Sequence, residues 1–121
     1  MLLNHTSGIR DNWGVMDYYS GDPDIELLDY LEQYLVPGGE LYNSNLNYTN
    51  NQPGTSFSYS NNGAALVGLL VETISGMPFN QYCNQNIFEP LSMESRWFLN
   101  ELDVYNFAMP YNLDNGSGDI C

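Results

Sequence analysis

The sequence predicts a mainly α-helical chain with long loops. Three observations carry this prediction: an apolar run at 62–75 with helix signals at both ends, an amphipathic segment at 23–35, and a polar stretch at 40–52 without any period. The chain has 121 residues, the length of one domain, so we expect residues 1–121 to form a single domain. Hydrophobic residues make up 43% of it, which is a globular composition.

The first helix is expected at 23–35. Asp22 is a favourable N-cap residue, and Pro23 suits the first helical position because no backbone N–H is needed there. Four leucines then recur at spacings of three and four and form one apolar face, which is typical of a surface helix. They are Leu27, Leu28, Leu31 and Leu35. The period-free stretch at 40–52 should be a long loop, and loops of this length are often functional.

The longest helix is expected to begin near Asn62. Its lead-in, PGTSFSYSN at 53–61, starts with a Pro-Gly turn signal, alternates like a short strand at 55–59, and ends at Asn61, a favourable N-cap residue. Gly76 should end the helix, and Pro78 blocks its continuation. A shorter helix should follow over 78–87.

Apolar side chains surround most of the axis of this longest helix. A helix of that kind is buried on most sides, so Leu66, Leu69 and Leu70 are expected in the core. Its apolar run is shorter than the roughly 20 residues that span a bilayer.

The charge balance excludes some partners. Lys and Arg together number 2 against 15 Asp and Glu, a formal net charge of −13, and both cations are arginines, Arg10 and Arg96. Nucleic acid and anionic membrane surfaces need clusters of basic residues, so neither is an expected partner. Cys83 and Cys121 form one disulfide or stay as two thiols. The acidic tail near Asp114 misses the calcium-loop pattern, and no metal site is expected.

Three polar residues stand directly before the longest helix: Tyr59, Ser60 and Asn61. A helix held by a core is a good place to aim polar groups at a ligand, but a tyrosine and an asparagine there can also serve only the turn and the cap. His5 is the only histidine, so any Ser-His-Asp triad would need it. In a turn such as NHTSG a structural role is the simpler interpretation.

Ordered motifs then point to a family. They are LLNHTSGI at 2–9, PGTSFSYSNNGAALVGLLVETISGMPFNQY at 53–82 and IFEPLSMESRWF at 87–98. Together they resemble, in order and spacing, the middle segment of the serine β-lactamase-like family, which includes class C β-lactamases, D-alanyl-D-alanine carboxypeptidases and related esterases. Ser92 stands where that family commonly has glycine, and 99–121 match weakly. The resemblance implies the helical part of the α+β β-lactamase/transpeptidase-like fold, with its sheet largely missing.

The resemblance also implies roles for the three polar residues. Tyr59 corresponds to the family's proton-shuttling tyrosine, Asn61 to its substrate-contacting partner, and Ser60 to the variable middle position. By this resemblance Ser60 is expected to bind substrate together with Asn61. Family members attack a lactam, amide or ester with a serine of a Ser-x-x-Lys motif and use no cofactor. Lysines lower the pKa of the tyrosine, because a free phenol with a pKa of about 10 is a poor base at neutral pH.

These 121 residues contain no lysine, so neither the Ser-x-x-Lys motif nor a downstream Lys-Thr-Gly-like motif lies among them. We therefore interpret the chain as a fragment of a serine hydrolase that is inactive alone. The alternative is a non-catalytic binding or assembly module that keeps the helical scaffold. In either case an apolar face normally covered by the missing sheet should join a second copy, giving a dimer or higher oligomer.

Overall fold

The computed structural model describes residues 1–16, 21–103 and 105, and its regular elements there are all helical. They are α1 (Leu27–Leu35), α2 (Asn61–Ser75), α3 (Phe79–Cys83), a π-helical turn η1 (Asn84–Phe88) and a 3₁₀ turn η2 (Leu99–Glu101). Within these residues the β pairing consists of one antiparallel bridge, between Ile9 and Tyr48. The predicted class, mainly α with long loops, is confirmed.

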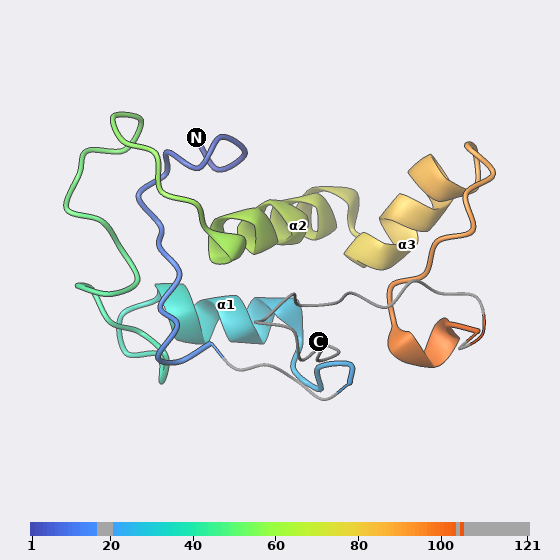
Figure 1. Cartoon of the computed structure of the whole chain (residues 1–121), viewed down its shortest axis with the longest axis horizontal. Coiled ribbons are helices and arrows are strands. Elements are labelled where there is room, and N and C mark those ends of the chain that lie inside the picture. Colours follow the sequence, from blue (N-terminus) through green and yellow to red (C-terminus); the bar gives the residue numbers. More distant parts are fainter. Residues whose placement is uncertain (17–20, 104, 106–121) are drawn as a thin grey trace, which may run out of the picture.

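The helices form a small open arrangement around α2. In Figure 1, α1 runs beside α2, α3 follows from the C-terminal end of α2, and the long connection between α1 and α2 loops around the N-terminal end of α2. Helix α2 packs against both α1 and α3. Leu27 of α1 and Phe79 of α3 both approach Gly68 of α2, which is buried. The contacts with α1 and α3 thus meet near Gly68, whereas the N-terminal end of α2 lies beside the connection from α1 (Figure 1).

The cap of α2 is one residue earlier than the sequence predicted. The backbone N–H of Gly63 donates to the hydroxyl oxygen of Ser60 (2.9 Å), so Ser60 is the N-cap residue and Asn61 begins the helix. Asn61 does not cap the helix, because its side-chain oxygen Oδ1 accepts from the hydroxyl of Tyr59. Gly76, in the left-handed region with φ 68°, ends the helix as predicted.

Helix α1 begins at Leu27, and the predicted start at Pro23 was wrong. The carboxylate of Asp22 accepts hydrogen bonds from the backbone N–H groups of Leu99 (2.8 Å) and Asn100 (3.4 Å). Asp22 therefore holds the first turn of η2 and does not cap α1. The first helical residue instead follows Glu26, which makes no side-chain cap.

The prediction that α2 is buried on most sides was wrong for the described residues. Leu66 and Leu69 are only half-buried, and Leu70 is 45% exposed. The cause is that α1 and α3 are the helices that pack on α2, leaving part of its apolar surface open. The buried apolar residues are instead Ile9, Leu31, Tyr34 and Cys83.

A polar network is the best-buried part of the molecule. Tyr34 of α1 and Asn47 of the long loop are both 0% exposed. The Asn47 amide donates to the backbone oxygens of Tyr34 and Leu41 (both 2.8 Å) and accepts from the amide of Asn12 (3.1 Å). The hydroxyl of Tyr34 donates to the backbone oxygen of Arg10 (2.8 Å) and accepts from the backbone N–H of Asn12 (2.7 Å). Because all these buried groups are paired, the network fixes segment 9–12 on α1.

Residues 55–59 do not form the predicted strand. They are tied instead to the N-terminal turn, since the backbone N–H of Ser58 donates to the backbone oxygen of His5 (2.8 Å). The neighbouring Gly54 makes the same kind of bond to Thr6 (2.7 Å). Two segments about fifty residues apart thereby meet just before α2.

Several remaining features agree with the sequence. The stretch 40–52 contains no helix, as predicted, and 79–88 is helical throughout. Ser92 has φ 53°, a left-handed conformation that glycine adopts most readily. Cys83 is buried, whereas Cys121 and the acidic tail near Asp114 lie outside the described residues. None of the helices in the described part is long and apolar enough to cross a membrane.

Candidate active site

The three predicted site residues lie together at the N-terminal end of α2. Tyr59 is 59% exposed, and its hydroxyl donates to the side-chain oxygen Oδ1 of Asn61 (3.1 Å). Ser60 lies between them in extended conformation, and α2 begins at Asn61. A phenol and an amide thus stand side by side on an exposed edge.

Asp11 holds this edge from the opposite segment. Its Oδ2 accepts from the backbone N–H (2.8 Å) and the side-chain Nδ2 (2.7 Å) of Asn61. Its Oδ1 accepts from the hydroxyl of Ser60 (2.9 Å) and from the backbone N–H (3.1 Å) and Nδ2 (3.0 Å) of Asn62. A carboxylate at a helix N-terminus also meets the positive end of the helix dipole. One side chain therefore fastens segment 60–62 to the N-terminal segment.

These contacts lower the pKa of Asp11 below its ordinary value. Partial burial of the carboxylate by itself raises the pKa, because it disfavours the charged form. The hydrogen bonds from the backbone N–H groups of Asn61 and Asn62 and from the side chains of Ser60 and Asn61 outweigh that effect. Asp11 is accordingly an anion at neutral pH.

His5 supports the tyrosine from the N-terminal turn. Its ring lies against the ring of Tyr59, with centroids 4.5 Å apart, and meets the edge of Phe57 at 5.8 Å. Its Nδ1 accepts a hydrogen bond from the backbone N–H of Ser60 (3.3 Å), so Nδ1 carries no proton in this arrangement. His5 itself has φ 55°. Through these contacts His5 packs against the ring of Tyr59 and binds the backbone of Ser60.

Ser60 does not have a hydroxyl open to a substrate. Its side chain is 1% exposed, and the hydroxyl both donates to Asp11 and accepts from Gly63. In this structure the hydroxyl of Ser60 serves the helix cap, and substrate binding by Ser60 stays a prediction.

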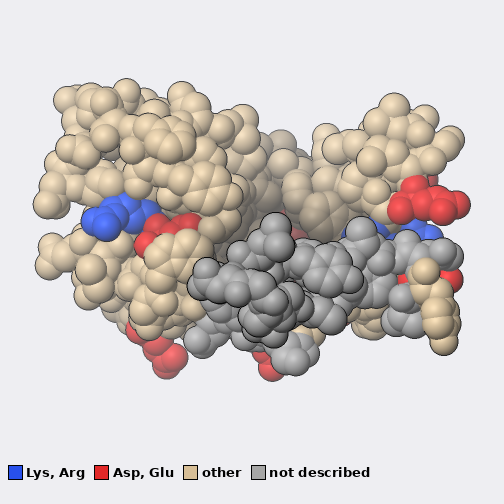
Figure 2. Space-filling view, in the orientation of Figure 1, with Lys and Arg blue, Asp and Glu red and all other residues tan. Residues whose placement is uncertain are grey.

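A shallow hollow lies in front of Tyr59. It has a volume of about 330 Å³ and is lined by Arg10, Asp11, Trp13, Ser58 and Tyr59. Arg10 brings one of the two cations of the chain to this hollow. Figure 2 shows the arginines as two separate blue patches on a surface with scattered acidic groups.

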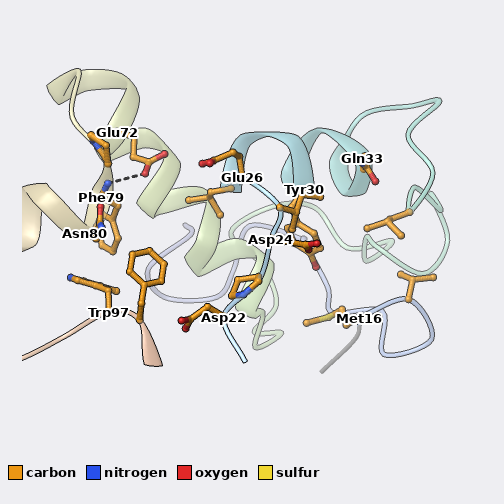
Figure 3. A pocket seen from close by; sticks show the side chains of 17 residues that line it. Met16, Asp22, Asp24, Glu26, Tyr30, Gln33, Glu72, Phe79, Asn80 and Trp97 are labelled. Carbon is orange, nitrogen blue, oxygen red and sulfur yellow. Dashed lines mark hydrogen bonds between the residues drawn. The ribbon is translucent and has the colours of Figure 1, made fainter. Parts of the chain in front are cut away.

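A larger cavity of about 760 Å³ lies elsewhere, among α1, the C-terminal half of α2, α3 and the segment at 97–98. Figure 3 shows its aromatic and acidic lining, including Trp97 and Phe79, and the hydrogen bond from the backbone N–H of Phe79 to Glu72 (2.8 Å). Neither Tyr59 nor Asn61 lines it. Size alone would favour this cavity. The smaller hollow is the candidate site because Tyr59 lines it, and Asn61, which is not itself a lining residue, is hydrogen-bonded to Tyr59.

The chemistry available at the smaller hollow is proton transfer and hydrogen bonding. A phenol can donate a proton and its phenolate can accept one, and an amide N–H can donate a hydrogen bond to a carbonyl group beside it. Within 1–16, 21–103 and 105, no three histidine, cysteine or acidic side chains come together as they would for a metal ion.

Comparison with known proteins decides the family. Residues 1–103 match the family described as Beta-lactamase, which is most of the chain. The chain belongs to the beta-lactamase family. The resemblance found in the sequence motifs is thereby confirmed.

Curated proteins similar to this chain include a D-aminopeptidase and a penicillin-binding protein. The chain is 26% identical over 117 residues to a D-aminopeptidase of Brucella anthropi, covering 97% of this chain and 21% of that protein. It is 32% identical over 117 residues to penicillin-binding protein 4* of Bacillus subtilis, covering 94% of this chain and 23% of that protein. The chain thus spans about a fifth of the length of these relatives.

A solved structure shows the same fold. The D-amino acid amidase of Ochrobactrum anthropi SV3, complexed with D-phenylalanine, superposes with a TM-score of 0.64 at 24% identity. The match covers 91% of this chain and 28% of the amidase. The described helices are therefore the helical part of a beta-lactamase-like fold, as the motifs predicted.

Sequence reasoning missed the residues that hold the site. Asp11 gave no signal, since an aspartate after a turn is commonly a solvated loop residue. Asn47 belongs to a polar stretch and Tyr34 to an amphipathic helix, so the complete burial of these two residues could not be predicted either. The turn signal of NHTSG and the family motif LLNHTSGI at 2–9 marked the segment that meets Tyr59, but neither indicated that contact.

Proposed function

We propose that this chain supplies the Tyr59–Asn61 part of a serine hydrolase site that acts on a small amide, lactam or ester. The observation that carries the proposal is the hydrogen bond from the Tyr59 hydroxyl to Asn61 Oδ1 (3.1 Å) at the N-terminal end of α2. Membership of the beta-lactamase family supports it. We further propose that residues 1–121 act as one domain.

In this proposal Tyr59 is the proton-shuttling residue and Asn61 contacts the substrate. Tyr59 acts from its phenolate form: as the serine oxygen forms its bond to the carbonyl carbon, the phenolate takes the hydroxyl proton. It then passes that proton to the leaving nitrogen or oxygen, whose bond to the carbonyl carbon breaks, and is a phenolate again. Water then hydrolyses the acyl-enzyme. The nucleophilic serine with its lysine is not among these 121 residues, which contain no lysine.

The charge of the chain narrows the proposed substrates. A net charge of −13 attracts cations and repels anions, and it leaves nucleic acid out of the proposed partners. A D-amino acid amide carries an ammonium group at neutral pH and is the kind of ligand that the names of the D-aminopeptidase and D-amino acid amidase relatives suggest. Among amides, lactams and esters we therefore favour an amino acid amide.

A chimera tests this function. Residues 1–103 would replace the matching segment of the Bacillus subtilis penicillin-binding protein, which would supply the rest of the chain; the match covers 23% of that protein. We expect the chimera to hydrolyse D-phenylalanine amide or a p-nitrophenyl ester, and the 121-residue chain alone to show only background hydrolysis. A chimera that folds, as judged by circular dichroism, yet shows no hydrolysis would contradict the proposed function.

The second candidate, an assembly module, is favoured by the apolar surface of α2. Leu70 is 45% exposed and Ile74 84% exposed, and Leu3 near the N-terminus is 83% exposed. Exposed apolar surface of this kind favours association. We expect sedimentation equilibrium to show a dimer or higher oligomer, and the double change Leu70→Ser with Ile74→Ser to give a monomer. A monomer at high concentration that binds no ANS would contradict this candidate.

A further inference from the structure

The orientation of the Asn61 amide decides what the candidate site can do. Its Oδ1 faces the hydroxyl of Tyr59 and its Nδ2 faces Oδ2 of Asp11. The reverse orientation would place Oδ1 against a carboxylate, two acceptors without a proton between them. The negative charge of Asp11 therefore selects this orientation.

Asp11 holds both the backbone and the side chain of Asn61. Oδ2 accepts from the backbone N–H (2.8 Å) and from Nδ2 (2.7 Å), so one oxygen fixes the side-chain torsions of Asn61 relative to its own backbone. Bonds to an ionised acceptor are shorter and stronger than neutral ones. Within the described residues Nδ2 donates to Asp11, which leaves its second hydrogen for a substrate carbonyl.

Asp11 is itself held in place from the buried side. The residues on either side of it in sequence, Arg10 and Asn12, both bond through their backbones to the hydroxyl of Tyr34 (2.8 and 2.7 Å). Tyr34 is 0% exposed, so this support is rigid. The buried hydroxyl of Tyr34 thus fixes the backbone on both sides of Asp11, and this holds the Asp11 carboxylate against the N-terminal end of α2.

We infer that Asp11 is the positioning residue of this site: it orients Asn61 so that Oδ1 receives the Tyr59 hydroxyl and the second Nδ2 hydrogen points to the substrate. The role toward a substrate rests on the proposed function, but the orientation of the Asn61 amide can be tested without a substrate. Among the titratable or charged groups near Asp11, Arg10 and Tyr59 line the same hollow, and Tyr34 interacts with its charge.

The test follows the Asn61 side-chain amide of the ¹⁵N-labelled 121-residue chain by NMR from pH 7 to pH 2. Protonation of Asp11 removes the acceptor, so the Asn61 Nδ2 signal should shift with one inflection below the ordinary Asp pKa of about 3.9. The side-chain amide of Asn47, which donates to backbone oxygens, is the internal control and should not shift over the same range. An Asn61 signal that shows no inflection while the Asn47 signal stays unchanged would overturn the inference.

Two variants with the same change of charge complete the test. In Asp11→Asn the inflection of Asn61 should vanish, and the ring Cζ signal of Tyr59 should move at pH 7 because its acceptor has rotated. Asp29→Asn, which alters an exposed residue of α1, should leave both signals unchanged. An Asn61 inflection that persists in Asp11→Asn, or a Tyr59 signal that does not move, would overturn the inference. Because no substrate is used, these results do not depend on whether the proposed function is correct.

Discussion

Replacing Tyr59 with Phe should lower the hydrolytic rate of the chimera by about 10²–10⁴-fold, the range for a lost general acid–base group. The hydroxyl is the only group removed; it bonds to Asn61, and the ring of Tyr59 lies against the ring of His5. The ring contact survives in phenylalanine, so the loss should come from the missing proton carrier. Steady-state kinetics with D-phenylalanine amide and a p-nitrophenyl ester measure the effect.

Tyr82→Phe is the matched control for this change. Tyr82 is a half-buried tyrosine of α3 and does not line the hollow in front of Tyr59. Its replacement should leave the rate unchanged. A Tyr59→Phe chimera that is slower by less than about tenfold would show that Tyr59 does not carry the proton.

The free energy of unfolding should fall sharply at alkaline pH, and Tyr34 should cause much of the fall. Burial raises the pKa of Tyr34 from 10.0 to about 12. A raised folded-state pKa means that stability is fully present below pH 10 and is lost as pH rises toward 12, since the unfolded chain loses its proton first. At about 1.4 kcal/mol per pKa unit, the loss is about 2–3 kcal/mol. Urea melts between pH 8 and pH 12 measure it.

Tyr34→Phe separates this effect from general alkaline unfolding. The change leaves the backbone oxygen of Arg10 and the backbone N–H of Asn12 without their partner, so it should cost about 1–3 kcal/mol at pH 7. Its alkaline loss should be much smaller than that of the wild type. Some loss should remain, because burial also raises the pKa of Tyr48. An unchanged alkaline loss in Tyr34→Phe would contradict the assignment.

The sequence was informative where local signals decide the structure. The helix at 61–75 and its glycine stop follow from apolar content and from Gly76, and the family follows from ordered motifs around Tyr59. The short helix after Pro78 was equally local. These features depend on neighbouring residues, which one sequence displays directly.

Features that depend on distant partners were not predictable. Asp22 looked like the cap of α1, yet its carboxylate bonds to residues 77 and 78 positions away. Asn61 looked like the cap of α2, but Ser60 is the cap, and Asp11, fifty positions earlier, holds both the backbone N–H and the side-chain amide of Asn61. The burial of α2 was overestimated because apolar content does not reveal how many neighbours a helix has.

The most direct test of the central claim is mass spectrometry after incubation with a fluorescent penicillin. The account predicts no acyl adduct on the 121-residue chain, whose site lacks a Ser-x-x-Lys nucleophile, and one adduct on the chimera, formed much more slowly when Tyr59 is replaced by Phe. Stoichiometric acylation of the 121-residue chain that is independent of Tyr59 would contradict the account and would place the nucleophile within these residues.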